Sequence, residues 1–263
     1  MKANTDMIGR VAVITGAARG IGLALALHAA DKGMRLALAD RDEPALIAVV
    51  EQVRAKDVAA IAIHGDMLVC DAVRELARRS AAELGPPWLV CNNPGVSIQM
   101  NLWGVIHGVQ VFAPDMVKRG EGHIVNIAAA ELFGTRGAAP YVAAAHAIVG
   151  LSEELYRELD SMGSQVGVTV VCPEVVRTNI TDTPAYRKAG RRLMSDFPLN
   201  ALTPQVVAEE IFDAVDTRRF RVLSETSPAN DPSASVAFPP RHSTAKTSCV
   251  APRKFRAASI SSV

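Results

Sequence analysis

The sequence contains few aromatic residues and few cysteines, and each shortage excludes a class of protein. Aromatic side chains make up 5% of the 263 residues, too few for a surface on which nucleic acid bases stack. The four cysteines form no C-x-x-C motif, and the histidines do not cluster with carboxylates, so neither a zinc site nor a disulfide scaffold is indicated. We expect no metal site and no nucleic acid partner. Cys91 and Cys172 lie in apolar runs and are predicted to be buried thiols.

Long hydrophobic runs are also missing. No apolar stretch reaches the ~18 residues that a membrane-spanning helix needs. Residues 1–10 are polar and include Asp6, a pattern that does not resemble a signal peptide. We therefore expect a cytoplasmic protein that does not enter a membrane.

Acidic residues are absent from the end of the chain. All 27 Asp and Glu residues lie at or before Asp231, whereas basic residues continue beyond it. The last forty residues are rich in Ser, Thr, Pro and Ala, a composition with little to bury. We predict one domain over residues 1–223 and a basic, disordered tail over residues 224–263. The tail could instead bind acidic lipid or nucleic acid, or be out-of-frame sequence.

What the sequence does contain is a regular alternation of short apolar runs and longer amphipathic stretches. This alternation predicts βα units around a parallel sheet whose strands are covered on both faces. The predicted strands are Val11–Thr15, Arg35–Asp40, Ala59–His64, Trp88–Asn92, His123–Ala128, Val166–Cys172 and Arg219–Leu223. The predicted helices are Gly20–Asp31, Glu43–Ala55, Asp71–Leu84, Leu102–Arg119, Tyr141–Met162 and Pro204–Val215.

A glycine-rich turn lies between the first predicted strand and the first predicted helix. Gly16 permits a tight turn, Gly20 lets the backbone approach a pyrophosphate, and Gly22 allows close packing of helix and strand. The helix N-terminus then presents unbonded N–H groups to the phosphates. A plain β–α turn is the alternative interpretation. The expected cofactor-binding backbone comprises Gly16, Arg19, Gly20, Ile21 and Gly22.

Asp40 ends the second predicted strand, where a carboxylate can accept both ribose hydroxyls of NAD and would repel a 2′-phosphate. Arg19 and Arg41 instead favour NADP, because either arginine could pair with that phosphate. We expect NAD in preference to NADP. A carboxylate here could also only cap the loop that follows it.

With these motifs the sequence resembles the short-chain dehydrogenase/reductase family over about residues 7–223. The resemblance implies a three-layer, Rossmann-like α/β fold with a mostly parallel seven-stranded sheet. It also implies hydride transfer between NAD(P) and a small alcohol or ketone, and homo-oligomers built on the two long central helices. The residues that carry it are Thr15–Gly22, Asp40, Asp66, Asn92–Gly95, Asn101, Tyr141 and Pro173–Thr178.

The resemblance assigns roles residue by residue. Tyr141 matches the family's general acid/base, and Asn101 matches its helix asparagine. Further contacts to the cofactor are implied for Asp66, Met67, Asn93 and Thr178.

Two further positions of the implied catalytic set carry alanine. Ala145 stands where the family's lysine follows the tyrosine, and Ala129 stands where its serine follows Asn126. His146 is no replacement for the lysine, because position i+5 lies about 140° around a helix from Tyr141, against about 40° for i+4.

Other departures surround the implied nicotinamide end of the site. Pro94 and Glu174 replace the usual alanine and glycine, and the segment Gly95–Asn101 is shorter than in typical members. The short segment should weaken the implied homo-oligomer.

Three hypotheses follow for the function. The first is an oxidoreductase of this family with weak or lost activity. The second is a dinucleotide-binding protein without catalysis, acting as a sensor or a partner subunit, and the third is a decayed gene product. The pattern does not identify a substrate.

Overall fold

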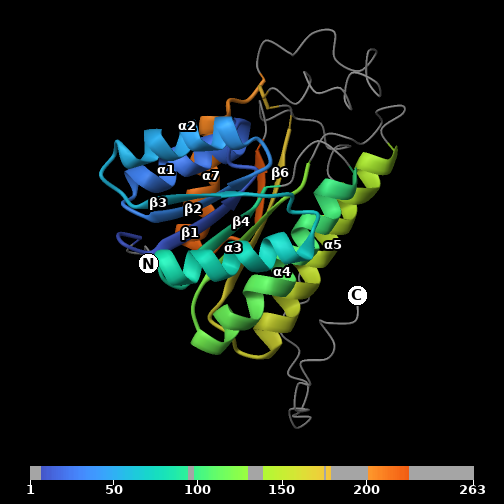
Figure 1. Cartoon of the computed structure of the whole chain (residues 1–263). Helices are drawn as coiled ribbons and strands as arrows, with labels where there is room; N and C mark the ends of the chain where they lie inside the picture. Colours follow the sequence, from blue (N-terminus) through green and yellow to red (C-terminus); the bar gives the residue numbers. More distant parts are fainter. Residues whose placement is uncertain (1–6, 94–97, 130–138, 175, 179–200, 225–263) are drawn as a thin grey trace, which may run out of the picture. The chain divides into compact units, whose positions relative to one another are not determined.

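A computed structural model describes residues 7–93, 98–129, 139–174, 176–178 and 201–224, with the backbone alone at 98–101 and 139–141. Its centre is a seven-stranded sheet in the order β3-β2-β1-β4-β5-β6-β7, and every neighbouring pair is parallel. Helices cover both faces (Figure 1), which confirms the predicted three-layer α/β fold. The strands are β1 Val11–Thr15, β2 Arg35–Asp40, β3 Ala60–His64, β4 Pro87–Asn92, β5 His123–Ile127, β6 Gly167–Pro173 and β7 Arg221–Ser224. The helices are α1 Gly20–Asp31, α2 Glu43–Arg54, α3 Cys70–Glu83, α4 Ile98–Arg119, α5 Ala139–Ser161 and α7 Pro204–Thr217.

The predicted elements lie within about two residues of the observed ones, with one exception. Helix α4 begins at Ile98 and not at the predicted Leu102. The prediction was wrong there because it started the helix at the first residue of an apolar stripe, whereas helical backbone can precede the stripe that packs on the sheet. Residues 94–97 and the predicted tail over 224–263, apart from Ser224, lie outside the described residues.

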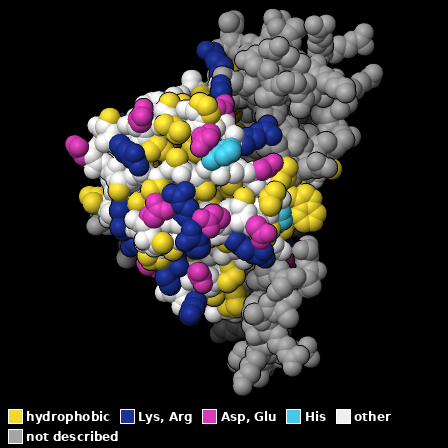
Figure 2. Space-filling view, in the orientation of Figure 1, with side chains coloured by type: hydrophobic (Ala, Val, Ile, Leu, Met, Phe, Trp, Pro, Cys, Tyr) yellow, Lys and Arg dark blue, Asp and Glu magenta, His cyan; other side chains and the backbone are white. Residues whose placement is uncertain are grey.

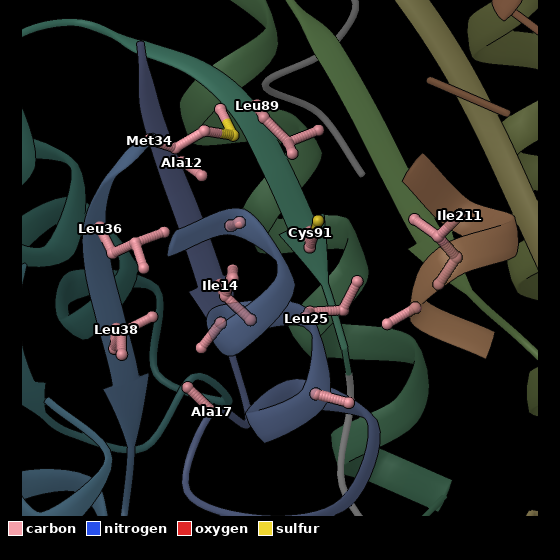
Figure 3. Close-up of a cluster of buried hydrophobic side chains, with 14 of the residues drawn as sticks. Ala12, Ile14, Ala17, Leu25, Met34, Leu36, Leu38, Leu89, Cys91 and Ile211 are labelled. Carbon is pink, nitrogen blue, oxygen red and sulfur yellow. The ribbon is translucent and has the colours of Figure 1, made fainter. Parts of the chain in front are cut away.

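Two apolar clusters hold the layers together, one on each face of the sheet. The central strands β1, β5 and β6 are buried at every position, as expected for parallel strands covered by helices on both sides. Helices α1, α2 and α7 form the first cluster, and α3, α4 and α5 form the second. Figure 3 shows part of the first cluster, to which Ile14 of β1, Leu25 of α1 and Ile211 of α7 contribute. Cys91 and Cys172 are buried, as predicted.

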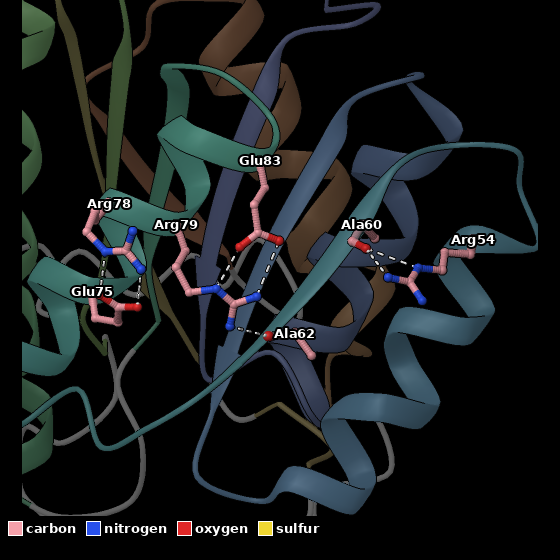
Figure 4. A network of polar contacts seen from close by, with 7 residues as sticks. All are labelled: Arg54, Ala60, Ala62, Glu75, Arg78, Arg79 and Glu83. Carbon is pink, nitrogen blue, oxygen red and sulfur yellow. Dashed lines mark hydrogen bonds and ion pairs between the residues drawn. The ribbon is translucent and has the colours of Figure 1, made fainter.

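Strand β3 is one edge of the sheet, and arginine side chains donate hydrogen bonds to its outward-facing carbonyls. Ala59 O accepts from β2, so the carbonyls of Ala60 and Ala62 point away from β2. Arg54 of α2 donates to Ala60 O at 2.7 and 3.0 Å, and Arg79 of α3 donates to Ala62 O at 3.4 Å (Figure 4). These contacts cover an edge that could otherwise pair with another chain.

Opposite charges are intermingled on the surface of the domain. Helix α3 carries three arginines paired with carboxylates three or four residues away, including Arg79 with Glu83 at 2.7 Å. In the view of Figure 2, basic and acidic side chains alternate over the described surface and form no large patch of one sign. Among the described residues, no helix has the length and apolar character needed to cross a bilayer.

Candidate functional site

The glycine-rich turn connects β1 to α1 and leaves no room for a side chain at Gly16 or Gly22. Gly16 and Gly20 have φ of +62° and +54°, which residues other than glycine rarely adopt. A Cβ atom on Gly16 would lie 2.5 Å from the carbonyl oxygen of Asn93, and one on Gly22 would lie 2.0 Å from that of Gly16. Both separations are far below any real Cβ contact, so the turn requires glycine for its shape.

The end of β4 is fastened to this turn by Asn93. Its backbone N–H donates to Thr15 Oγ1 at 3.0 Å, and its side-chain Nδ2 donates to the carbonyl of Gly16 at 3.1 Å. Asn93 therefore lies at the predicted site. Its amide N–H groups support the turn, which makes it a positioning residue in this structure.

The N-terminus of α1 follows the turn directly. Arg19 is the N-cap residue, and no side chain among the described residues caps α1. In contrast, Asp42 caps α2 and Thr203 caps α7 through their side-chain oxygens. Because the first N–H groups of a helix have no intrahelical partner, those of Gly20, Ile21 and Gly22 can serve an anion placed at this end.

Asp40 lies beside the turn at the carboxyl end of β2. Its Oδ2 accepts from the backbone N–H of Ala18 at 3.0 Å, and its Oδ1 accepts from that of Asp42 at 3.0 Å. The second bond is the loop cap that the sequence left open as an alternative. Each carboxylate oxygen accepts more than one hydrogen bond, so both interpretations fit the same side chain.

The two arginines near Asp40 differ in their surroundings. Arg19 Nη2 donates to Oδ2 of Asp42 in a close ion pair. This bond, and to a smaller extent the backbone bond from Ala45, holds the pKa of the Asp42 carboxyl below its usual value. Arg41 is exposed and has no ion-pair partner among the residues that the structure describes. Sequence reasoning identified both arginines but not the role of Asp42, whose only local signal is an Asp two residues before Pro44.

Asp66 and Met67 follow β3, next to the end of β2. The N–H of Gly65 donates to the carbonyl of Asp40 at 3.1 Å, and Asp66 Oδ1 accepts from the N–H of Leu68 at 3.0 Å. The carbonyl of Met67 lies 3.4 Å from Nδ1 of His107 in α4. This segment therefore joins the β2 end of the site to α4.

Thr178 reaches the turn from the segment after β6. Its Cγ2 would lie 3.1 Å from a Cβ atom on Gly20, so the threonine methyl packs over that glycine. Together with Asn93 and Asp40, it brings three segments that are far apart in the sequence to one glycine-rich turn. These are the places where the sequence predicted contacts to a cofactor.

A buried chain of hydrogen bonds lies at the same end of the sheet. Asn92 Nδ2 donates to Asn126 Oδ1 at 2.9 Å, Asn126 Nδ2 donates to Ser152 Oγ at 3.0 Å, and that hydroxyl donates to the carbonyl of Ile148 at 2.7 Å. A Cβ atom on Gly108 would lie 2.0 Å from Asn92 Oδ1. The chain links β4, β5 and α5. Sequence reasoning missed it, although an asparagine that ends a buried strand is a usable signal.

The predicted catalytic residues lie on the two long helices of the second layer. Tyr141 is in α5 and Asn101 is in α4, and their side chains lie outside the described residues. Ala145, four residues after Tyr141, is buried, whereas His146 is exposed and its Nδ1 lies 2.8 Å from the carbonyl of Val142. The two positions therefore face different sides of α5, as the helical angle predicts.

The positions around the implied nicotinamide end are described in part. Ala129 is half-buried two residues after the end of β5, and the N–H of Glu174 donates to the carbonyl of Ser224 at 3.0 Å. Pro94 and Gly95 lie outside the described residues.

The buried thiols are poor nucleophiles. Burial raises the pKa of Cys91 to about 12 and that of Cys172 to about 11, so both are protonated at neutral pH. Among the described residues, no group of three or more His, Cys, Asp or Glu side chains could hold a metal ion. Within the described part of the chain, the groups best placed to bind a ligand are therefore those of the glycine-rich turn and its neighbours.

Known proteins are similar to this chain in sequence and in overall structure. SadH of Mycobacterium tuberculosis, whose name includes the word oxidoreductase, is 32% identical over 238 residues, covering 82% of this chain and 86% of SadH. The 1-deoxy-11-beta-hydroxypentalenate dehydrogenase of Streptomyces avermitilis is 30% identical over 235 residues, covering 81% and 83%. A short chain dehydrogenase/reductase of Burkholderia phymatum, crystallised in complex with NAD, has a TM-score of 0.76 and 35% identity, covering 85% of this chain and 91% of that one.

The family itself is identified by a match over residues 10–186, described as short chain dehydrogenase. The match begins just before β1 and includes the turn, Asp40, Asn93 and Tyr141. It spans more than half of the sequence, and the topology and glycine contacts above agree with it. The chain belongs to the short chain dehydrogenase family of oxidoreductases.

Proposed function

We propose that this protein binds a nicotinamide dinucleotide, with NAD preferred, and is a slow oxidoreductase for small alcohols or ketones. The observation that carries the proposal is the contact between Gly16 and Gly22, which closes the turn beneath the uncapped N-terminus of α1. This cradle admits a pyrophosphate because no Cβ stands in its way.

The residues around the cradle fit the rest of such a molecule. The N–H groups of Gly20 and Ile21 would hold the pyrophosphate, and the Asp40 carboxylate would accept the ribose hydroxyls. Asp66 and Met67 would line the adenine end, and Thr178 would close over Gly20 from the other side. When bound, the nicotinamide supplies or accepts a hydride. The preference for NAD is supported by Asp40 and by the 35% identical structure that contains NAD.

Proton transfer to or from the substrate oxygen falls to Tyr141 in this proposal, with Asn101 as the helix asparagine of the set. A tyrosine has a pKa of about 10, and a neighbouring lysine cation lowers it by roughly 1–3 units. With alanine at position 145, about one tyrosine in 10³ is ionised at neutral pH. Alanine at position 129 removes a hydroxyl donor, and one such donor is typically worth about 10²–10³ in rate.

Nucleotide binding is tested by thermal melts with NADH and NADPH over a concentration range. A nucleotide present at a concentration of 100 times its Kd adds about 2.7 kcal/mol to the free energy of unfolding. This raises the Tm of a domain this size by about 5–10 °C. Gly20→Ala should reduce this shift, because it places a Cβ at positive φ against Thr178. Gly150→Ala in α5, where a Cβ meets no atom within 4 Å, should keep it. No shift with either nucleotide would contradict the proposal.

Turnover is tested by restoring the two side chains that the family uses. Ala145→Lys combined with Ala129→Ser should oxidise secondary alcohols at least about 10²-fold faster than the natural sequence. A natural protein that is as fast as the double variant would refute the assignment of these positions.

A second candidate function is dinucleotide binding without catalysis, as a partner subunit of an active relative. It is favoured by the burial of Ala145 in α5, because the position where the family has a lysine is here a buried methyl group. Nucleotide-dependent melting with no turnover in either protein, together with co-purification of an active relative, would support it. A chain without any cooperative melt would instead support the decayed product. The predicted homo-oligomer through α4 and α5 stays a proposal, testable by sedimentation.

A further inference from the structure

Four charged residues lie in the segments where the glycine-rich turn approaches the end of β2. Arg19 belongs to the turn, while Asp40, Arg41 and Asp42 follow one another at the end of the strand. Oδ1 of Asp40 accepts the backbone N–H of Asp42 at 3.0 Å, so the Asp40 carboxylate is held against the backbone of the residue that pairs with Arg19. The ribose-facing carboxylate and the Arg19–Asp42 ion pair therefore belong to one corner of the site.

Asp42 is held in place from two directions. Its Oδ1 accepts from the N–H of Ala45 at 3.2 Å and caps α2, while its Oδ2 accepts from Arg19. The side chains of Arg19 and Asp42 are 58% and 36% exposed, so the pair lies at the surface and a nucleotide can reach it. Because the cap fixes Asp42, the pair also fixes the guanidinium of Arg19.

A 2′-phosphate is the group that would compete for this guanidinium. Arginine binds phosphate through a planar fork of N–H donors, and a carboxylate occupies the same fork. To bind Arg19, a 2′-phosphate must displace Asp42 or lie beside its negative charge. A ribose that carries a 2′-hydroxyl makes neither demand.

We infer that Asp42 is a specificity-determining residue: by holding Arg19, it weakens binding of the 2′-phosphorylated dinucleotide relative to NAD. The inference rests on the proposed function and adds a residue to it. Asp40 repels the phosphate directly, whereas Asp42 acts by occupying the arginine that would otherwise attract it. Exposed Arg41 leaves some affinity for the phosphate in the natural protein.

The test measures Kd for NADH and NADPH by calorimetry in the natural protein and in Asp42→Asn. Asparagine caps a helix as well as aspartate does, so α2 keeps its N-terminus while Arg19 loses its ion pair. We expect the ratio of Kd for NADPH to Kd for NADH to fall about tenfold, the effect of one charge-assisted hydrogen bond. Asp42→Asn combined with Arg19→Gln should return the ratio to its natural value.

The matched control is Asp31→Asn, which breaks an exposed ion pair of the same kind. Asp31 pairs with Lys56 at 2.6 Å at the far end of α1, with side chains 60% and 37% exposed. This variant removes the same charge and should leave the ratio unchanged. An equal shift in Asp31→Asn, or a shift that survives Arg19→Gln, would overturn the inference by showing an effect of net charge only.

The outcomes separate the inference from the proposed function. NADH binding with an unchanged ratio in Asp42→Asn refutes the role of Asp42 and leaves the proposed function standing. No binding of either nucleotide to the natural protein or to Asp42→Asn overturns both.

Discussion

Substituting alanine for glycine at two helical positions should have opposite effects on stability. Gly22 in α1 and Gly150 in α5 both lie within helices, where alanine is intrinsically favoured by about 1 kcal/mol. Their surroundings differ. A Cβ on Gly150 meets no atom within 4 Å, while one on Gly22 would lie 2.0 Å from the backbone oxygen of Gly16 and 2.8 Å from Nδ2 of Asn93.

The magnitudes decide the sign at each position. Forcing a methyl group into a packed site typically costs about 1–3 kcal/mol, and here the obstacle is backbone that cannot rotate away. Loss of the bond from Asn93 to Gly16 costs about 1 kcal/mol more. After the helix-propensity gain of about 1 kcal/mol, Gly22→Ala should destabilise the protein by about 2 kcal/mol. Gly150→Ala should stabilise it by about 0.5–1 kcal/mol.

Urea unfolding followed by circular dichroism measures both variants, with thermal melts alongside. The expected changes in Tm are a fall of about 4–8 °C for Gly22→Ala and a rise of about 1–4 °C for Gly150→Ala. A Gly22→Ala protein as stable as the natural one would refute the close approach of α1 to the turn. Melting at two protein concentrations shows whether Gly150 also lies in a contact between copies of the chain. In that case Gly150→Ala would lower the stability instead of raising it.

Three further predictions concern buried or edge-strand groups. Burial, with a smaller effect of the Arg218 cation, lowers the pKa of His123 to about 3, so the unfolded chain binds more protons between pH 6.5 and 3. The free energy of unfolding should therefore decrease as pH falls below 6.5, by up to about 1.4 kcal/mol per pH unit, and His123→Gln should lack this contribution in urea titrations at pH 7 and 5. Ser152→Ala should cost about 1–3 kcal/mol, because it leaves Nδ2 of Asn126 buried without an acceptor, and a Ser152→Ala protein of unchanged Tm would contradict the hydrogen-bond chain. Arg54→Ala should increase light scattering at high concentration by uncovering the outer carbonyl of β3. Arg74→Ala on α3 should not, because its hydrogen bond within the described part of the chain goes to the exposed Asp71 and not to the edge strand.

The outline of the site was predictable because local rules determine it. Each strand ends where its apolar run ends, and in a parallel sheet those ends meet at one edge. The positions of Gly16, Asp40, Asn93 and Thr178 along the chain were therefore enough to expect them in one region. The roles of Tyr141 and Asn101 came from resemblance, and they stay predictions.

The succession of strands and helices along the chain, the glycine-rich turn and the family could all be inferred from the residues alone. They depend on periodicity and on residues that are close together in the chain. Which polar groups form hydrogen bonds and ion pairs with one another became visible only in the folded chain. Asp42 holds Arg19 across 23 residues, and Asn92 bonds to Asn126 across 34. Such pairings depend on the packing of α1 against β2 and the register of β4 with β5, which residue spacing does not encode. A side chain bonds to the group that lies near it in space, and those distances are set only when the sheet and its helices have packed together.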